Sequence, residues 1–385
     1  MCWEGDGEGG SAAAAAGAGK QRELRASMKT VEFSIGKRRI GSERPVYIVA
    51  EMSANHGQQF DEAVRLVHAM KEAGADAVKL QTYTPDTITV DCSSPCFHIG
   101  KGSLWAGRNL YQLYGEAYTP WEWQPRLKAI AEGLGLDCFS TPFDPTAVDF
   151  LESLHVPAYK IASFEVVDIP LIRKVARTGK PVIMSVGMAV WPEIEEAVAA
   201  VRAEGNQQVA LLKCTSAYPA PLDEMNLRTI PDLSARTGLP VGLSDHTLGC
   251  TAAIAAVALG ACVIEKHFTL SRSVPGPDSA FSLEPGEFRR MVDAVRETEQ
   301  SLGRVSYDVA EHEKVSRSYR RSLFVVRDVR AGETFTGENV RSIRPADGLP
   351  PKHLDAVLGR RARRDLPLGT PLSWDDVEGP REGAR

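Results

Sequence analysis

The chain has 385 residues, of which 43% are hydrophobic and 25% are charged, and its formal net charge is −5. This length suits two or three domains, or one large barrel with an accessory module, and the composition supplies enough apolar residues for a large core. The mild negative charge argues against nucleic acid as a partner, because nucleic-acid-binding proteins usually have a basic face. A small anionic substrate would need locally placed lysines and arginines. No apolar run approaches the length of a membrane span, so no membrane partner is expected.

Seven cysteines, an odd number, are scattered through the sequence, and Cys214 and Cys262 lie in apolar runs. This pattern is typical of reduced, buried thiols and predicts a cytoplasmic protein rather than a disulfide framework. Cys92 and Cys96 are close in sequence, but the other ligands of a zinc site are not evident.

The first 27 residues are rich in glycine and alanine and lack the apolar core of a signal peptide. A second methionine, Met28, precedes the first strand-like segment, KTVEFSIG. We expect residues 1–27 to be a disordered extension and translation to start at Met28.

From Tyr47 onward, short β-rich apolar runs alternate with segments of helical periodicity. The strand candidates are 47–51, 77–83, 137–143, 158–163, 181–187, 209–215, 241–247 and 262–268. Each is followed by a segment with amphipathic helical spacing, such as DEAVRLVHAMKEAG after the first. This alternation predicts an α/β protein with a closed (β/α)8 TIM barrel. An open doubly wound sheet is the alternative, but its glycine-rich nucleotide turn is missing, since the first turn reads EMSANHG.

The barrel is expected over residues 28–303, and a polar linker over 304–321. Segment 322–378 has short strand-like runs, turn glycines and little helical periodicity, which predicts a small β-rich domain. The connection 84–123 inside the barrel is unusually long and rich in tryptophan and tyrosine. Long loops in compact domains are usually functional. This one is interpreted as a packed aromatic lid, as a substrate-selecting wall, or as both.

The expected strand ends are unusually polar, and (β/α)8 enzymes carry out their chemistry at these ends. Residues two apart on a strand share a face. In chain order, the polar residues at the strand ends are Glu51, Lys79, Gln81, Lys160, Ser163, Ser185, Ser244, His246, Glu265 and His267.

His246 and His267 are expected at the same depth on consecutive strands, 21 residues apart in sequence. Neighbouring strands lie about 4.8 Å apart, so two imidazoles that point the same way can share one ion. Imidazole suits a divalent metal such as Mn²⁺, Co²⁺ or Zn²⁺, and two protein ligands leave positions open for a Lewis-acid role. The alternative is that one histidine is an ordinary core residue.

Lys79 and Lys160 both occupy barrel positions, where an unpaired ammonium is costly to bury. A ligand with phosphate or carboxylate groups would explain both, and Ser163, Ser185 and Ser244 could add hydroxyl donors. A Schiff-base lysine is the alternative, as in some aldolases.

Several long strings, in order, resemble the sialic acid synthase family: AEMSANH, KLQTYTPDT, STPFDPTAVDFLE, PAYKIASFE, LSDHTLG, IEKHFTL and PGPDSAFS. The resemblance runs from about residue 46 to residue 378, and the C-terminal segment is similar to the antifreeze-like, or SAF, domain. EMSANH, the insert GSLWAGRNLYQLYGEAYTPWEW and LLKCTSAYPAP are most similar to the members that make pseudaminic acid. Members that make N-acetylneuraminic or legionaminic acid share the catalytic motifs and remain the alternatives.

The resemblance implies a transferase that condenses phosphoenolpyruvate with an acetamido sugar aldehyde and releases phosphate. For the pseudaminic acid branch this sugar is 2,4-diacetamido-2,4,6-trideoxy-L-altrose. The resemblance also implies a divalent metal ion, Mn²⁺ first and Mg²⁺ or Co²⁺ as alternatives, with His246 and His267 as its ligands. A domain-swapped homodimer is implied as well.

Further site residues are carried over from the same resemblance. The phosphoenolpyruvate-contacting positions are Lys79, Lys160, Ser163, Ser185, Ser216 and Ser244. At Ser216, neuraminate synthases often have Asn. The positions around the sugar and the reacting carbons are Glu51, Gln81, Tyr218 and Asp278. Arg344 matches an arginine that reaches the sugar's acetamido group in the barrel of the other subunit.

Glu51 is the candidate to position or deprotonate the attacking water, and its alternative role is a structural carboxylate paired with Lys79. Two rival functions stay open: a class I aldolase with Lys160 as the Schiff base, and a sugar- or ice-binding protein suggested by the C-terminal segment alone. The polar strand ends favour the enzyme over the binding protein.

Overall fold

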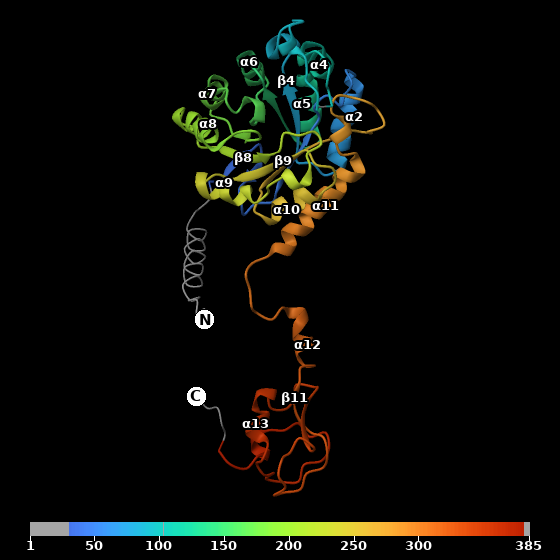
Figure 1. The fold of residues 1–385 in the computed structure, drawn as a ribbon, viewed down its shortest axis with the longest axis vertical. Helices are drawn as coiled ribbons and strands as arrows, with labels where there is room; N and C mark the ends of the chain where they lie inside the picture. Colours follow the sequence, from blue (N-terminus) through green and yellow to red (C-terminus); the bar gives the residue numbers. More distant parts are fainter. Residues whose placement is uncertain (1–30, 103, 381–385) are drawn as a thin grey trace, which may run out of the picture. The chain divides into compact units, whose positions relative to one another are not determined.

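The computed structural model describes residues 31–102 and 104–380. The expected extension, residues 1–27, lies outside the described residues. The chain divides between Gly303 and Arg304 into two compact units, and each is described here by itself (Figure 1).

The first unit contains a closed barrel of eight parallel strands, in which the last strand, β10, pairs with both β9 and β3. The strands are β3 (Tyr47–Glu51), β4 (Ala77–Thr82), β5 (Asp137–Pro142), β6 (Tyr159–Ile161), β7 (Val182–Ser185), β8 (Val209–Cys214), β9 (Val241–Asp245) and β10 (Val263–His267). The predicted fold class is confirmed, and every strand candidate contains one barrel strand. β6 is shorter than expected, because the chain already turns into a 3₁₀ helix, η3 (Ser163–Glu165), where the strand was predicted to end.

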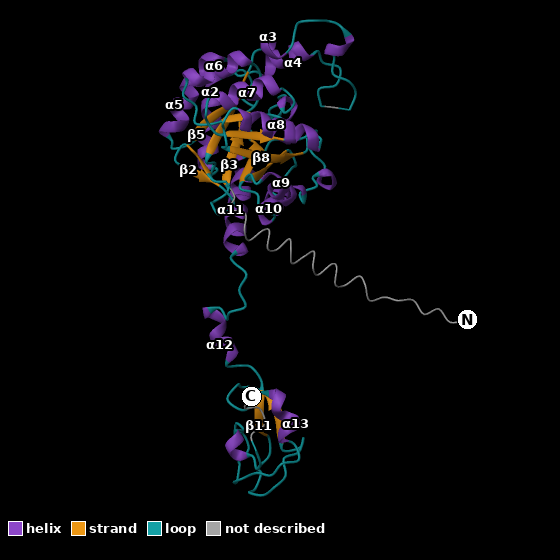
Figure 2. Cartoon of the chain, turned by 90° about the vertical axis from the view of Figure 1, so that its left-hand side faces the viewer, coloured by secondary structure: helices purple, strands orange, loops and turns teal. Residues whose placement is uncertain are grey.

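Helices follow the strands and surround the barrel (Figure 2). They are α2 (Phe60–Glu72), α3 (Pro85–Ile88), α4 (Leu110–Ala117), α5 (Gln124–Gly133), α6 (Pro145–Ser153), α7 (Ile169–Arg177), α8 (Trp191–Ala203), α9 (Thr229–Thr237), α10 (Thr251–Ala258) and α11 (Pro285–Leu302). Local sequence sets where they begin. The Asp144 carboxylate accepts hydrogen bonds from the backbone N–H groups of Thr146 and Ala147, and Pro145 occupies the first helical position of α6.

The barrel strands are buried on both faces, one against the helices and one against the barrel interior. All five residues of β3 and all four of β7 are buried. This double burial explains why the strands appear in the sequence as continuous apolar runs rather than as alternating patterns.

The amino-terminal ends of the strands are covered by a hairpin of β1 (Phe33–Ile35) and β2 (Arg38–Ile40). Arg38 forms ion pairs of 3.2 Å with Asp76 and 3.0 Å with Asp137, which lie at the starts of β4 and β5. In a (β/α)8 barrel, polar contacts at this end serve stability, so the chemistry belongs at the opposite end.

The long connection 84–123 packs its aromatic residues against the rest of the barrel unit. The Trp121 ring stacks on Phe150 with centroids 4.7 Å apart, and the Trp105 ring lies 5.6 Å from that of Tyr218. The packed arrangement expected for this insert is therefore present, and Trp105 extends it toward the loop that follows β8.

The second unit has its own small core. β11 (Ser322–Val325) pairs antiparallel with β12 (Val340–Ile343), and the unit also contains the short helices α12 (Lys314–Arg317) and α13 (Leu354–Val357). Arg344 directly follows β12 and is exposed. Among the helices of residues 31–102 and 104–380, none has the length and apolar character needed to cross a membrane.

Candidate active site

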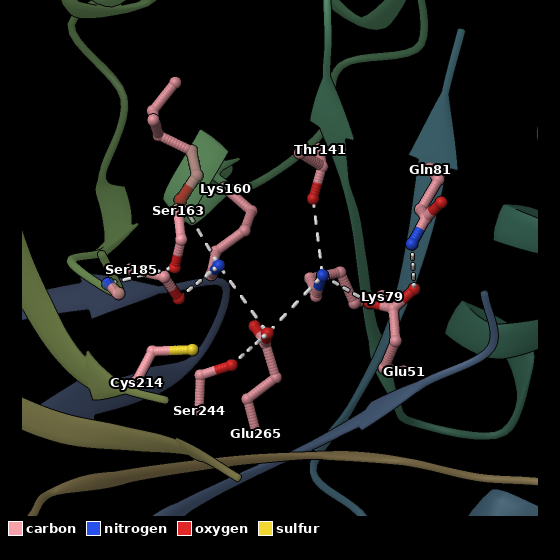
Figure 3. Close-up of polar contacts among 12 residues, drawn as sticks. Glu51, Lys79, Gln81, Thr141, Lys160, Ser163, Ser185, Cys214, Ser244 and Glu265 are labelled. Carbon is pink, nitrogen blue, oxygen red and sulfur yellow. Dashed lines mark hydrogen bonds and ion pairs between the residues drawn. The ribbon is translucent and has the colours of Figure 1, made fainter. Parts of the chain in front are cut away.

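The carboxyl ends of the barrel strands bring most of the predicted polar residues into one cluster (Figure 3). The register explains how: Glu51 at the end of β3 is paired with Lys79 on β4 and with His267 on β10. Glu265 on β10 is in turn paired with Ser244 on β9. Glu51, Lys79 and His267 therefore share one level at the strand ends, and Glu265 and Ser244 lie two residues below it.

Two lysines and two glutamates form the centre of this cluster. The ammonium of Lys79 forms an ion pair with Glu51, and it lies 3.5 Å from a carboxylate oxygen of Glu265. The ammonium of Lys160 lies 3.5 Å from the same Glu265 oxygen, from the other side (Figure 3). All four side chains are at most 5% exposed. The buried charges balance, which makes the burial of both lysines tolerable.

Hydroxyl groups complete the surroundings of the two lysines. Lys160 donates a hydrogen bond of 2.7 Å to Ser185, and Lys79 donates one of 3.3 Å to Thr141. Ser244 donates a hydrogen bond of 3.2 Å to Glu265. The predicted anion-binding residues Lys79, Lys160, Ser185 and Ser244 thus lie together.

The pKa values of the two glutamates are shifted in opposite directions. Burial alone would raise the pKa of Glu265, but Lys160 and Lys79 outweigh it and lower that pKa below its ordinary value, so Glu265 is ionised. Burial raises the pKa of Glu51 above its ordinary value despite the opposing charge of Lys79. The two carboxyl groups of one buried cluster therefore differ in how readily they take up a proton, and Glu51 is the one that does so more readily.

Ser163 and Ser216 flank Gly187, just beyond β7. The Ser163 hydroxyl accepts a hydrogen bond of 3.0 Å from the backbone N–H of Gly187. A Cβ atom at position 187 would collide with the Ser216 hydroxyl and would lie 2.8 Å from the Ser163 hydroxyl, so only glycine leaves both in place. This requirement for glycine was not anticipated from the sequence.

His246 and His267 are brought together as predicted, with ring centroids 5.3 Å apart. The Nδ1–H of His246 donates a hydrogen bond of 3.0 Å to the carbonyl oxygen of Thr215, so Nε2 is the ring nitrogen that remains to bind a metal. The Nδ1 atom of His267 is buried and has no hydrogen-bond partner among the described residues. Burial first, and the neighbouring His246 second, lower the pKa of His267 well below its ordinary value, so this imidazole is neutral.

These features fit a metal ligand pair, because metals bind neutral imidazoles whose other nitrogen is often fixed by a carbonyl group. Within residues 31–102 and 104–380, no group of three or more His, Cys, Asp or Glu side chains is placed to hold a metal ion. This part of the chain therefore offers two imidazoles and no third side-chain ligand of these types.

A second polar chain leads from Glu51 toward the mouth of the barrel. Gln81 donates hydrogen bonds of 3.3 Å to Glu51 and 3.0 Å to the hydroxyl of Ser53. The hydroxyl of Ser53 in turn contacts the carboxylate of Asp278. The ring of Tyr218 lies 4.5 Å from that of His246. The residues expected around the sugar thus border both the lysine–glutamate cluster and the histidine pair.

Three participants were not assigned a role from the sequence. Glu265 was recognised only as a polar residue on the face of His267, yet it contacts both lysines. Ser53 connects Gln81 to Asp278. Cys214 lies 3.8 Å from Nδ1 of His246. In the sequence, the only indication that these three residues belong to the site is that each lies at or beside the end of a strand. Arg344 belongs to the second unit, so its relation to this cluster is not described.

Comparison with known proteins identifies the class. Residues 66–307 match the NeuB family, and residues 320–378 match the SAF domain. The chain therefore belongs to the NeuB family, as its resemblance to sialic acid synthases predicted.

Among its relatives, the chain is 45% identical to the pseudaminic acid synthase of Helicobacter pylori over 339 residues, which cover 87% of this chain and 98% of that protein. It is 36% identical to the N,N'-diacetyllegionaminic acid synthase of Legionella pneumophila over 343 residues, which cover 88% of this chain and 96% of that protein. Among solved structures, it is similar to the N-acetylneuraminic acid (sialic acid) synthetase of Leptospira borgpetersenii, in complex with citrate. That likeness has a TM-score of 0.67 and 30% identity, and it covers 74% of this chain and 95% of the other.

Proposed function

We propose that this chain is a transferase that condenses phosphoenolpyruvate with 2,4-diacetamido-2,4,6-trideoxy-L-altrose to give pseudaminic acid and phosphate. The observation that carries this proposal is the pairing of a buried two-lysine cluster with a pair of histidines at the carboxyl ends of one barrel. The greater identity to a pseudaminic acid synthase than to a legionaminic acid synthase supports the choice of acceptor.

A divalent metal ion would be held by His246 and His267. When bound, it supplies a Lewis acid that polarises the aldehyde oxygen of the open-chain acceptor. Mn²⁺ is the first candidate and Mg²⁺ or Co²⁺ the alternatives. The hydrogen bond from Nδ1 of His246 to Thr215 leaves Nε2 as its nitrogen for the metal, and the lowered pKa of His267 keeps that imidazole neutral.

Phosphoenolpyruvate carries a phosphate and a carboxylate, and both need cations or hydrogen-bond donors. Lys79 and Lys160 supply two ammonium groups within the buried cluster, where electrostatic interactions are stronger than in water. Hydrogen bonds to charged groups are worth about 1.5–3 kcal/mol each. The hydroxyl donors proposed for the same ligand are Ser163, Ser185, Ser216 and Ser244.

The reaction forms one carbon–carbon bond and breaks one carbon–oxygen bond. C3 of phosphoenolpyruvate attacks the aldehyde carbon, and positive charge develops at C2. Water adds to C2, and the resulting intermediate expels phosphate by cleavage of the bond between C2 and the bridging oxygen. Glu51 is the proposed base for this water, since its pKa is raised and it sits beside Lys79 and Gln81. Its pairing with Lys79 also gives it a structural role, and the two roles are compatible.

Gln81, Tyr218 and Asp278 are proposed to contact the acceptor sugar, because they border the histidine pair and Glu51. Arg344 is proposed to reach the sugar's acetamido group from the SAF domain of a second subunit in a domain-swapped homodimer. This arrangement is carried over from the family resemblance, and the exposed position of Arg344 at the end of β12 is compatible with it.

The test is to incubate the purified protein with phosphoenolpyruvate, Mn²⁺ and a panel of acetamido sugars, with phosphate release and product mass as readouts. The expected product combines the carbon skeletons of both substrates, with one phosphate released for each. Release of phosphate only with N-acetylmannosamine, or only with the legionaminic acid precursor, would reassign the acceptor. Trapping of pyruvate on Lys160 by borohydride, without phosphate release, would favour the aldolase instead.

A further inference from the structure

Trp105, in the long insert 84–123, is tied to two other loops at the mouth of the barrel. Its indole Nε1–H donates a hydrogen bond of 2.9 Å to the carbonyl oxygen of Pro277, which precedes Asp278. Its ring centroid lies 5.6 Å from that of Tyr218, with the two planes at 54°. The insert after β4 thus meets the loops after β8 and β10 at this one side chain.

Aromatic contacts connect Trp105 to the histidine pair. The Tyr218 ring lies 4.5 Å from His246 and 5.0 Å from Phe281, and Phe281 lies 4.9 Å from His267. Trp105 is therefore one ring further out than Tyr218. An open-chain sugar whose aldehyde lies at the histidines would extend its far end along this row of rings toward Trp105.

The chemistry that Trp105 can offer at that end is narrow. Indole has one hydrogen-bond donor and no acceptor, and Pro277 already takes that donor. What remains for a ligand is the apolar ring. A methyl group gains from contact with such a surface, whereas a hydroxyl pressed against it gives up hydrogen bonds to water without replacement.

We propose that Trp105 is a specificity-determining residue that forms the apolar end of the acceptor site. It selects acetamido sugars whose terminal carbon is a methyl group over those whose terminal carbon bears a hydroxyl. This inference rests on the proposed function and gives it a structural basis for preferring a 6-deoxy acceptor. Discrimination through one apolar group amounts to about 10- to 200-fold in kcat/KM.

The chain offers a matched control within the same insert. Trp121 is also half-buried, and its Nε1–H also donates to a carbonyl oxygen, that of Tyr83, at 3.0 Å. Its ring, however, stacks on Phe150 instead of Tyr218. Trp105→Gln and Trp121→Gln therefore make the same chemical change in similar surroundings, and only Trp105 adjoins the proposed acceptor site.

The experiment compares wild type, Trp105→Gln, Trp105→Tyr and Trp121→Gln. The ratio of kcat/KM for 2,4-diacetamido-2,4,6-trideoxy-L-altrose to kcat/KM for its 6-hydroxy analogue, 2,4-diacetamido-2,4-dideoxy-L-altrose, is measured for each, together with KM for phosphoenolpyruvate. Trp105→Gln is expected to lower the ratio by about 10-fold or more, with KM for phosphoenolpyruvate changed less than about twofold. Trp105→Tyr, which keeps a ring but adds a hydroxyl, is expected to lower the ratio less, and Trp121→Gln to leave it unchanged.

Equal ratios in wild type and Trp105→Gln, or equal losses in Trp105→Gln and Trp121→Gln, would overturn the proposal. If Trp105→Gln does not fold, as judged by circular dichroism, Trp105→Tyr decides: an unchanged ratio there overturns it. A wild-type protein that releases no phosphate with any acetamido sugar would instead refute the proposed function. The two failures are thus distinguishable.

Discussion

A buried ion pair between the residues that precede the two histidines gives the most direct quantitative test of what stabilises the site. Lys266 and Asp245 have side chains that are 0% exposed, with 2.6 Å between ammonium and carboxylate. Each directly precedes a histidine of the pair, on β10 and β9 respectively. Lys266 also donates to the backbone carbonyl of Thr247, so it links the end of β10 to the turn after β9.

The perturbation is Lys266→Met, which leaves the buried Asp245 carboxylate without its cation. Removing one partner of a buried ion pair costs about 3–5 kcal/mol of unfolding free energy. For a domain of this size, that loss lowers the unfolding temperature by about 6–10 °C, at about 2 °C per kcal/mol. The double variant Lys266→Met/Asp245→Asn should lose less unfolding free energy than Lys266→Met alone, because it no longer buries an unpaired charge.

The assay is a double-mutant cycle by chemical or thermal unfolding, with calorimetric titration of Mn²⁺ as a second readout. Arg289→Met is the control, since the Arg289–Asp293 pair is 57% and 56% exposed, and such pairs contribute about 0–1 kcal/mol. Lys266→Met should weaken Mn²⁺ binding, and Arg289→Met should not. Purely additive losses in the cycle, or a loss in Lys266→Met no larger than in the control, would refute the reasoning.

Three further outcomes are expected. His246→Ala should abolish both Mn²⁺ binding and turnover while the far-ultraviolet circular dichroism stays native; full wild-type activity in EDTA would contradict the metal role. Lys160→Met should raise KM for phosphoenolpyruvate by about 10-fold or more, because it removes a hydrogen bond to a charged group; an unchanged KM would exclude Lys160 from the anion site. Mixing Arg344→Ala with His246→Ala subunits should restore activity at about one site in each mixed dimer if the arginine acts in trans, since one barrel then has an intact His246 and receives an intact Arg344; mixed dimers no more active than the parents would place Arg344 in cis or outside catalysis.

The barrel was predictable because parallel strands buried on both faces have a distinctive sequence pattern. β3 was placed with both ends correct, since YIVAE is apolar up to the glutamate that ends it. The depth of His246 and His267 followed from the same regularity, because consecutive strands of a barrel are hydrogen-bonded in a fixed register. Local sequence could not show that β6 ends early, since Ser163 at the start of η3 accepts a hydrogen bond from Gly187 in the loop after β7, which is far away in sequence.

The contacts across the barrel were beyond the sequence alone. Glu265 sits between Lys79 and Lys160, which come from strands on other sides of the barrel, and no spacing rule gives that distance. The meeting of Trp105 with Tyr218 and Pro277 likewise depends on how a long insert folds back over the barrel. Periodicity predicts which face a side chain occupies, and only the closed barrel determines which faces meet.

The balance of charge in the cluster explains why its carboxylates matter to the proposed reaction as much as its lysines. Burying two ammonium groups without partners would cost several kcal/mol of folding free energy for each. Glu51 and Glu265 provide the partner charges that stabilise both lysines before any ligand binds. An incoming phosphate and carboxylate then compete with Glu265 for Lys79 and Lys160, which moderates the affinity for phosphoenolpyruvate. Because Glu265 touches both lysines while Glu51 touches only Lys79, the two carboxylates are not equivalent. The pKa of Glu265 is lowered by Lys160 and Lys79, which fits a fixed anion that pairs with both lysines, whereas burial raises the pKa of Glu51. This difference between two carboxylates in the same buried cluster supports the proposal of Glu51, rather than Glu265, as the base.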